Sequence, residues 1–144
     1  MTVANILKGK HAAVLWVSPA LSVGAVAQRL RSSGVGVMIV SNDGESLAGL
    51  ISERDIAHGL AAHGAALPSL KVSDLMARSV ITCTPQDDVA EIARIMTMRR
   101  IRHIPVIDGG KVVGVISIGD VLKSRISEIE TEANVLRDLA VAHR

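Results

Sequence analysis

The chain has 144 residues, of which 49% are hydrophobic and 21% are charged, so its composition is that of a globular protein and not of a disordered one. Sixteen Lys and Arg against fourteen Asp and Glu leave a formal charge of +2, too small an excess to predict nucleic-acid binding. The lack of Phe and Tyr excludes an aromatic platform for single-stranded nucleic acid. The single cysteine, Cys83, excludes an internal disulfide and a cysteine-based zinc cluster.

The N-terminal stretch has features of a secretory signal peptide. Lys8, Lys10 and His11 precede a mostly apolar run that ends in Ala-Val-Ala before Gln28. No apolar run in the chain is long enough to span a membrane. The same segment recurs in the interior of the sequence, where it could not act as a signal. We therefore reject the secretory interpretation and predict a soluble, cytoplasmic protein.

The second half of the sequence repeats the first half. Identical residues recur in the same order, with one residue fewer in the turn that follows Gly110 than in the turn that follows Gly44. A repeat over a whole chain means that each copy is one supersecondary unit. The identical pairs are Pro19 and Pro85, Val23 and Val89, Ala27 and Ala93, Val40 and Val106, Gly44 and Gly110, Gly49 and Gly114, Ile51 and Ile116, Ser52 and Ser117, and Asp55 and Asp120.

Each copy predicts the element order β-α-β-β-α. An apolar stripe with helical spacing predicts one helix from about Val23 and another from about Val89, and Asp88 with Glu91 matches a capping box. A second helix of each copy is expected after Ser52 and after Ser117. Asn-Asp-Gly and Asp-Gly-Gly sequences predict hairpin turns. The expected strands are residues 14–17, 37–40 and 47–51 in the first copy, and 80–83, 104–107 and 111–116 in the second.

The domain organisation follows from the size of the copies. Neither copy would bury much apolar surface alone, so we expect the two to pack together in one α/β (α+β) body. Residues 1–68 are predicted to form the first repeat with an N-terminal arm, residues 69–126 the second repeat, and residues 127–144 an extension of the last helix. Residues 63–69 are interpreted as the linker between the repeats.

The last predicted helix carries apolar residues at alternating steps of four and three, the heptad pattern of a coiled coil. Because this helix outlasts the repeat, the pattern favours self-association into a homodimer. The alternative is that this face packs back on its own domain. The residues are Leu122, Ile126, Ile129, Ala133, Leu136 and Ala140.

Each copy ends in a motif of Gly, two apolar residues, Ser, two variable residues and Asp. Residues 49–55 read Gly-Leu-Ile-Ser-Glu-Arg-Asp, and residues 114–120 read Gly-Val-Ile-Ser-Ile-Gly-Asp. With the duplicated element order over residues 1–126, these motifs resemble a tandem pair of CBS domains (a Bateman module) of the small stand-alone bacterial type. The resemblance implies two repeats packed about a pseudo-twofold axis, with two ligand clefts between them and a long C-terminal helix.

The physical chemistry of the motif suits a nucleotide. Ser52 and Ser117 fall where a strand passes into a helix, so free backbone amides and a hydroxyl are expected to face a phosphate at the positive helix end. Asp55 and Asp120, one turn further on, can accept both hydroxyls of a ribose. The alternative is an ordinary helix cap, in which Ser and Asp satisfy their own helix. The duplication within a CBS-like module favours ligand sites.

The resemblance also implies two sets of nucleotide-binding residues. Arg102 and His103 would meet the phosphates, since a guanidinium grips phosphate oxygens, although a solvated basic turn is the alternative. The first copy has Gly36 and Val37 at the equivalent positions, where Arg54 could replace the missing phosphate contact. The set for the second repeat is Lys10, Ala12, Val35, Arg102, His103, Val115, Ser117 and Asp120. The set for the first repeat is Leu50, Ser52, Arg54, Asp55, Met76, Arg78 and Ile101.

The predicted function is a regulatory, signal-transducing module. The family permits AMP, ADP, ATP, NAD(H) or S-adenosylmethionine, so the expected ligand is AMP or a related adenine nucleotide, with NAD(H) as a larger candidate. Ligand binding would change the orientation of the repeats, which an unknown protein partner would detect. The competing hypothesis is a structural dimerisation adaptor with vestigial nucleotide sites.

No enzyme activity is predicted. The sequence contains no HExxH motif, no P-loop and no metal-ligand spacing beside His103. Cys83 is interpreted as a small, semi-buried filler and Trp16 as a residue of the core or of a cleft wall.

Overall fold

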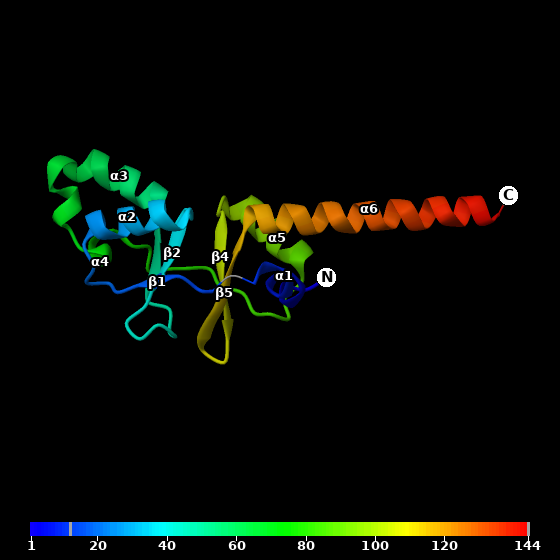
Figure 1. The fold of residues 1–144 in the computed structure, drawn as a ribbon, viewed down its shortest axis with the longest axis horizontal. Coiled ribbons are helices and arrows are strands. Elements are labelled where there is room, and N and C mark those ends of the chain that lie inside the picture. Colours follow the sequence, from blue (N-terminus) through cyan, green and yellow to red (C-terminus); the bar gives the residue numbers. More distant parts are fainter. Residues whose placement is uncertain (12, 144) are drawn as a thin grey trace. The chain divides into compact units, whose positions relative to one another are not determined.

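A computed structural model describes residues 1–11 and 13–143. Short strands alternate with helices, and the last helix is much the longest (Figure 1). The predicted mixed α/β class is confirmed. The elements are α1 (Val3–Lys10), β1 (Trp16–Val17), α2 (Val23–Ser33), β2 (Val37–Val40), β3 (Gly49–Ser52), α3 (Glu53–His63), the 3₁₀ helix η1 (Gly64–Ser69), α4 (Val72–Leu75), α5 (Val89–Arg99), β4 (His103–Asp108), β5 (Lys111–Ser117) and α6 (Ile118–Ala142).

The chain divides into two compact units, neither of which is a single stretch of sequence. Unit 1 comprises Met1–His11, Cys83–Ile104 and Ile116–Arg144. Unit 2 comprises Ala12–Thr82 and Pro105–Val115. The paired strands β4 and β5 therefore contribute residues to both units.

Unit 2 contains a three-stranded sheet in the order β1-β2-β3. Strand β1 is parallel to β2, and β2 is antiparallel to β3 with Val37 opposite Ser52 and Val40 opposite Gly49. The apolar stripe of α2 packs on this sheet because residues at helical spacing lie on one face of the helix. The buried core of unit 2 consists of Val17, Val26, Leu30, Met38, Val40, Ile51, Val72 and Met76.

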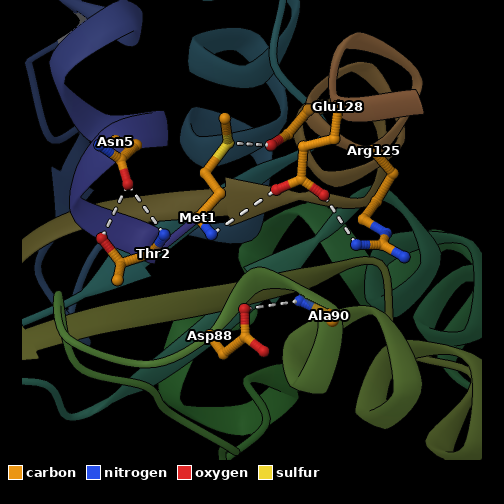
Figure 2. A network of polar contacts seen from close by, with 8 residues as sticks. Met1, Thr2, Asn5, Asp88, Ala90, Arg125 and Glu128 are labelled. Atoms are coloured by element: carbon orange, nitrogen blue, oxygen red, sulfur yellow. Dashed lines mark hydrogen bonds and ion pairs between the residues drawn. The ribbon is translucent and has the colours of Figure 1, made fainter. Parts of the chain in front are cut away.

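Unit 1 is built from α1, α5 and α6. Val3 donates its backbone N–H to the carbonyl of Asp87 at 2.9 Å, and Val89 donates to the carbonyl of Met1 at 3.1 Å. Figure 2 shows Glu128 of α6 between the Met1 amino group, at 3.7 Å, and the Arg125 guanidinium, at 2.7 Å. The start of α1 is thus joined by backbone hydrogen bonds to the start of α5 and the residues just before it, and by one ion pair to α6. Buried side chains of this unit include Val3, Val89, Ile92, Met96, Ile104, Ile116 and Val121.

Helix α4 makes the same contacts in unit 2 that α1 makes in unit 1. Val72 donates its N–H to the carbonyl of Leu21 at 2.8 Å, and Val23 donates to the carbonyl of Leu70 at 2.8 Å. The duplication therefore includes the short helix that packs ahead of each apolar helix. The correspondence is not evident in the sequence, because Val3 and Val72 are the one identical pair where α1 and α4 align.

Three local predictions are wrong. Residues 80–83 form no strand, because only Cys83 makes an isolated β-bridge and residues 80–82 make none. Asp88 caps α5 through the N–H of Ala90 at 3.4 Å (Figure 2), but Glu91 pairs with Arg94 on its own helix instead of completing a capping box. The hydrogen bond from the Arg94 guanidinium lowers the pKa of Glu91 below its ordinary value. For Trp16 only the core alternative is wrong, because the residue is 43% exposed and lies against Gly44; its place in a cleft wall stays a prediction.

Two further features concern the predicted linker and the cysteine. Residues 63–69, expected as a linker, hold the 3₁₀ helix η1. Cys83 is buried, and burial together with the charge of Asp87 raises the pKa of its thiol to about 12, which is consistent with a side chain that only fills space.

Within residues 1–11 and 13–143, no helix combines the length and apolar character needed to cross a bilayer.

Candidate functional site

Both Ser-x-x-Asp motifs form reciprocal helix caps. At the start of α3, the Ser52 hydroxyl accepts the Asp55 N–H at 3.2 Å, and Asp55 Oδ2 accepts the Ser52 N–H at 2.9 Å. At the start of α6, Ser117 accepts the Asp120 N–H at 3.1 Å, and Asp120 Oδ2 accepts the Ser117 N–H at 2.9 Å. The cap is therefore formed at both positions. The use of the same carboxylates by a ligand stays a prediction.

The backbone amides at these helix starts are less free than expected. The N–H of Glu53 donates to the carbonyl of Gly36 at 2.9 Å, and the N–H of Ile118 donates to the carbonyl of Arg102 at 2.8 Å. Two of the first three amides of each helix are thus satisfied by the protein itself, so the expectation of a row of free amides is wrong. Anion binding here would depend on side chains. The same two bonds confirm that Gly36 and Arg102 are equivalent positions.

Lys10 distinguishes the cap of α6 from the cap of α3. Its Nζ lies 2.7 Å from Asp120 Oδ2. Partial burial raises the pKa of Asp120, but the bonds from Lys10 and Ser117 outweigh it and hold the pKa below its ordinary value. The resemblance implied that Lys10 belongs to the nucleotide-binding set, but it did not imply an ion pair with Asp120. Its side-chain role was missed because no local pattern links residues so far apart in the sequence.

Unit 1 thus gathers one group of the predicted residues at the start of α6. Arg102 is exposed, and its carbonyl is held by the first amide of α6. His103 follows it as the first residue of β4 and is half-buried. We call Lys10, Arg102, His103, Ser117 and Asp120 the Asp120 group.

Unit 2 gathers a second group at the start of α3. Leu50 exchanges two backbone hydrogen bonds with Ala77, at 3.0 and 2.9 Å, which places residues 76–78 beside β3. Met76 belongs to the core, and the Arg78 guanidinium donates to the carbonyl of Ser73 at 3.0 Å. Arg54 is exposed on the first turn of α3. We call Leu50, Ser52, Arg54, Asp55, Met76 and Arg78 the Asp55 group.

The remaining predicted site residues fall elsewhere. Val35 and Val115 are half-buried residues of unit 2, and Ile101 is a half-buried residue of unit 1. Ala12 lies outside the described residues. Among the residues that the structure describes, no three His, Cys, Asp or Glu side chains gather as they would around a metal ion.

The duplicated α-β-β-α order and its two identical caps define a class of tandem-repeat α/β modules. The family model for the CBS domain matches residues 10–62 and 72–127, which is most of the chain. The chain therefore belongs to the CBS domain family. The predicted resemblance is confirmed.

Known relatives agree with this assignment. The mitochondrial CBS domain-containing protein CBSX3 of Arabidopsis thaliana is 34% identical over 139 residues, covering 91% of this chain and 68% of that protein. The crystal structure of the CBS-domain protein ATU1752 from Agrobacterium tumefaciens has a TM-score of 0.83 and 34% identity, covering 87% of this chain and 99% of that one. PAE2072 of Pyrobaculum aerophilum, solved in complex with AMP, has a TM-score of 0.73 and 24% identity, covering 83% and 89%.

Proposed function

We propose that the chain is a regulatory, non-catalytic module that binds an adenine nucleotide and signals its presence to a partner protein by a conformational change. One observation carries the proposal: the same Ser-x-x-Asp cap stands at the start of two helices in a CBS-domain chain. The hydrogen bonds that Asp55 and Asp120 accept from described residues all reach Oδ2. This arrangement leaves Oδ1 of each carboxylate to accept ribose hydroxyls.

The Asp120 group is the better candidate for a phosphate-bearing ligand. Lys10 brings its ammonium group to Asp120, and the backbone of Arg102, whose side chain is exposed, is bonded to the first residue of α6, with His103 next in the chain. A guanidinium binds phosphate oxygens in a bidentate manner. We propose AMP or a related adenine nucleotide as the ligand of this group. PAE2072 shares the fold and was solved with AMP, which supports the choice of AMP as the first probe.

The Asp55 group has fewer cations to offer. Arg78 donates to a backbone carbonyl, and Gly36 stands where the second copy has Arg102. Arg54 alone is left on the first turn of α3 as a phosphate contact. We therefore propose weaker phosphate binding by this group, which leaves room for a ligand with less exposed phosphate charge, such as NAD(H).

The alternative function is a structural adaptor whose nucleotide sites are vestigial. The caps favour it, because the Ser and Asp side chains already satisfy their own helices without a ligand. An adaptor would keep its assembly and partner binding in variants that remove Asp55 or Asp120. A sensor would lose its ligand response in those variants.

Thermal melting with AMP, ATP, NADH and S-adenosylmethionine tests the proposal. A ligand that binds only the folded chain stabilises it by about 2.7 kcal/mol at a hundredfold excess over Kd, a shift of several degrees. We expect AMP to raise the Tm and Asp120→Ala to abolish the increase. Protein refolded from denaturant and shown free of bound nucleotide is used throughout.

A matched control is needed because Asp120→Ala also removes a cap. Asp74→Ala removes the same kind of cap, since Asp74 Oδ2 accepts the Lys71 N–H at 2.9 Å at the start of α4. Each variant is compared with its own ligand-free melt. Asp74→Ala should keep the AMP response. No shift with any of the four ligands would favour the adaptor.

A further inference from the structure

The C-terminal part of α6 presents an apolar face that no described residue covers. Helix α6 has 25 residues, and its first part packs on α1 and α5, whereas the rest projects beyond them (Figure 1). The large apolar residues of the heptad pattern are exposed to 55%, 56%, 61% and 67%, for Leu122, Ile126, Ile129 and Leu136 in that order. The alternative prediction, that this face packs back on its own domain, is therefore wrong.

We propose that α6 pairs with α6 of a second molecule of this chain as a parallel, in-register two-stranded coiled coil. The seam supplies residues at both core positions of the heptad. Ile126, Ala133 and Ala140 take position a, and Leu122, Ile129 and Leu136 take position d. We call these six residues the seam. This assembly is independent of nucleotide binding.

The charges that flank the seam favour a second molecule as the occupant. Arg125 and Glu132 occupy g positions, and Glu130 and Arg137 occupy e positions. In a parallel coiled coil each g residue faces the e residue five positions later on the other helix. Arg125 then faces the partner's Glu130, and Glu132 faces the partner's Arg137. Both pairs are of opposite charge, and symmetry forms each pair twice.

An antiparallel pairing that overlaps the whole seam would instead bring like charges together at the flanking positions. With Ile126 opposite the partner's Leu136, the flanking positions bring Glu130 against the partner's Glu130 and Glu132 against the partner's Glu132. Lys123 then faces the partner's Arg137. Every one of these contacts joins like charges, which disfavours the pairing. The charge pattern thus selects the parallel orientation.

The strength of the pairing is limited by its length and composition. The seam covers about three heptads, near the length at which helix pairs become marginal, and Ala at two a positions buries little surface. In the structure Arg125 already pairs with Glu128, whereas Glu132 and Arg137 form no ion pair with another described residue. We therefore expect a concentration-dependent dimer in which Glu132 and Arg137 are the more informative pair.

Sedimentation equilibrium of the full chain over a range of concentrations tests the proposal. We expect a monomer–dimer equilibrium that Ile129→Asn combined with Leu136→Asn weakens at least tenfold. Val135→Asn combined with Val141→Asn is the control, because these side chains are 52% and 64% exposed on α6 but lie off the seam. All four positions are exposed, so circular dichroism should show an intact fold in both variants.

Charge exchange and cross-linking test the orientation. Glu132→Arg and Arg137→Glu should each weaken the dimer several-fold, and the double variant should restore it. Leu136→Cys should form a disulfide between two chains, because only the parallel register places residue 136 opposite itself. The native Cys83 does not compete, because it is buried.

Three results would overturn the proposal. A monomer at all concentrations would exclude a second molecule and leave the face to a different partner. A dimer insensitive to the seam variants would place the interface elsewhere. A seam-dependent dimer that Leu136→Cys cannot cross-link would exclude the parallel orientation.

Discussion

The two copies differ most in the short helix that packs ahead of each one. In unit 1, α1 runs for eight residues and ends with Lys10 beside Asp120. In unit 2, α4 runs for four residues and ends at Leu75, after which Ala77 pairs with Leu50. The same cap thus has a lysine contact in one unit and a backbone segment close by in the other. Identical motifs do not make identical sites when a neighbouring element of different length decides what reaches them.

The largest expected effect concerns the backbone segment beside β3. A Cβ at Gly49 would lie 2.5 Å from the carbonyl oxygen of Ala77, a backbone atom that cannot turn aside. Gly49→Ala should therefore lower the free energy of unfolding by about 1–3 kcal/mol, as overpacking does. Thermal or urea unfolding of the ligand-free chain measures it. A change below 0.5 kcal/mol, on the order of the scatter among surface substitutions, would mean that residues 76–78 move freely away from β3.

The two cap carboxylates should differ in their contribution to stability. Asp55→Ala removes a cap and should cost about 1 kcal/mol. Asp120→Ala removes an equivalent cap and also the pair with Lys10, which adds a few tenths to about 1 kcal/mol for a partly exposed ion pair. Urea unfolding without ligand compares the two variants. Equal losses would show that the Lys10 contact adds nothing to stability.

The contact between Lys10 and Asp120 should depend on pH. The folded pKa of Asp120 lies below its ordinary value of 3.8, so its contribution is complete well above that value and is lost as the pH falls through the folded pKa. Lys10→Met should destabilise the chain at pH 7 by up to about 1 kcal/mol and have a diminishing effect below about pH 4. Tm values from pH 7 to pH 3 measure this difference.

Lys8 offers a control on the same helix for this pH dependence. Lys8 forms no ion pair with another described residue, so Lys8→Met should have little effect at either end of the pH range. An effect of Lys10→Met that persists undiminished at pH 3 would assign it to the aliphatic part of the side chain.

The smallest expected effect is a stabilisation. Gly119 lies in the first turn of α6, where a Cβ would meet nothing closer than the Ser117 hydroxyl oxygen at 3.6 Å. The first copy has Arg54 at the equivalent position. Gly119→Ala should raise the free energy of unfolding by up to about 1 kcal/mol, because Ala loses less conformational entropy. Gly34→Ala is the contrasting control: Gly34 has a φ of 66°, so this change should destabilise. If Gly119→Ala destabilised the chain, the smaller loss of conformational entropy expected for Ala on folding would not be the dominant effect.

Much of the fold could be predicted because it is encoded locally. The helix that begins at Val23 and the caps at Ser52 and Ser117 follow from residues within one or two turns of each other, and the duplication repeats these local patterns. The prediction failed where a local pattern had competing partners. Glu91 matched a capping box with Asp88, but Arg94, three residues away in the other direction, provides a charged partner instead.

The candidate site was predictable only in part. The Ser and Asp residues were identified from the motif, and the equivalence of Gly36 and Arg102 from the repeat. The hydrogen bonds of the Glu53 and Ile118 amides were not predicted. Their acceptors are the carbonyls of Gly36 and Arg102, which lie about 16 residues earlier in the chain, just before β2 and β4. The ligand roles of the Asp120 and Asp55 groups stay predictions that the melting experiment addresses.

The sequence by itself determined the α/β class, the two repeats, the CBS domain family and the heptad pattern of α6, because periodicity and short motifs are properties of neighbouring residues. Only the tertiary structure decided that α1 packs with the second copy, that Lys10 reaches Asp120, and that the seam of α6 is exposed. These contacts join residues far apart in the chain. Such contacts depend on where each helix ends and which chain segment passes beside it, and a pattern of neighbouring residues does not record either.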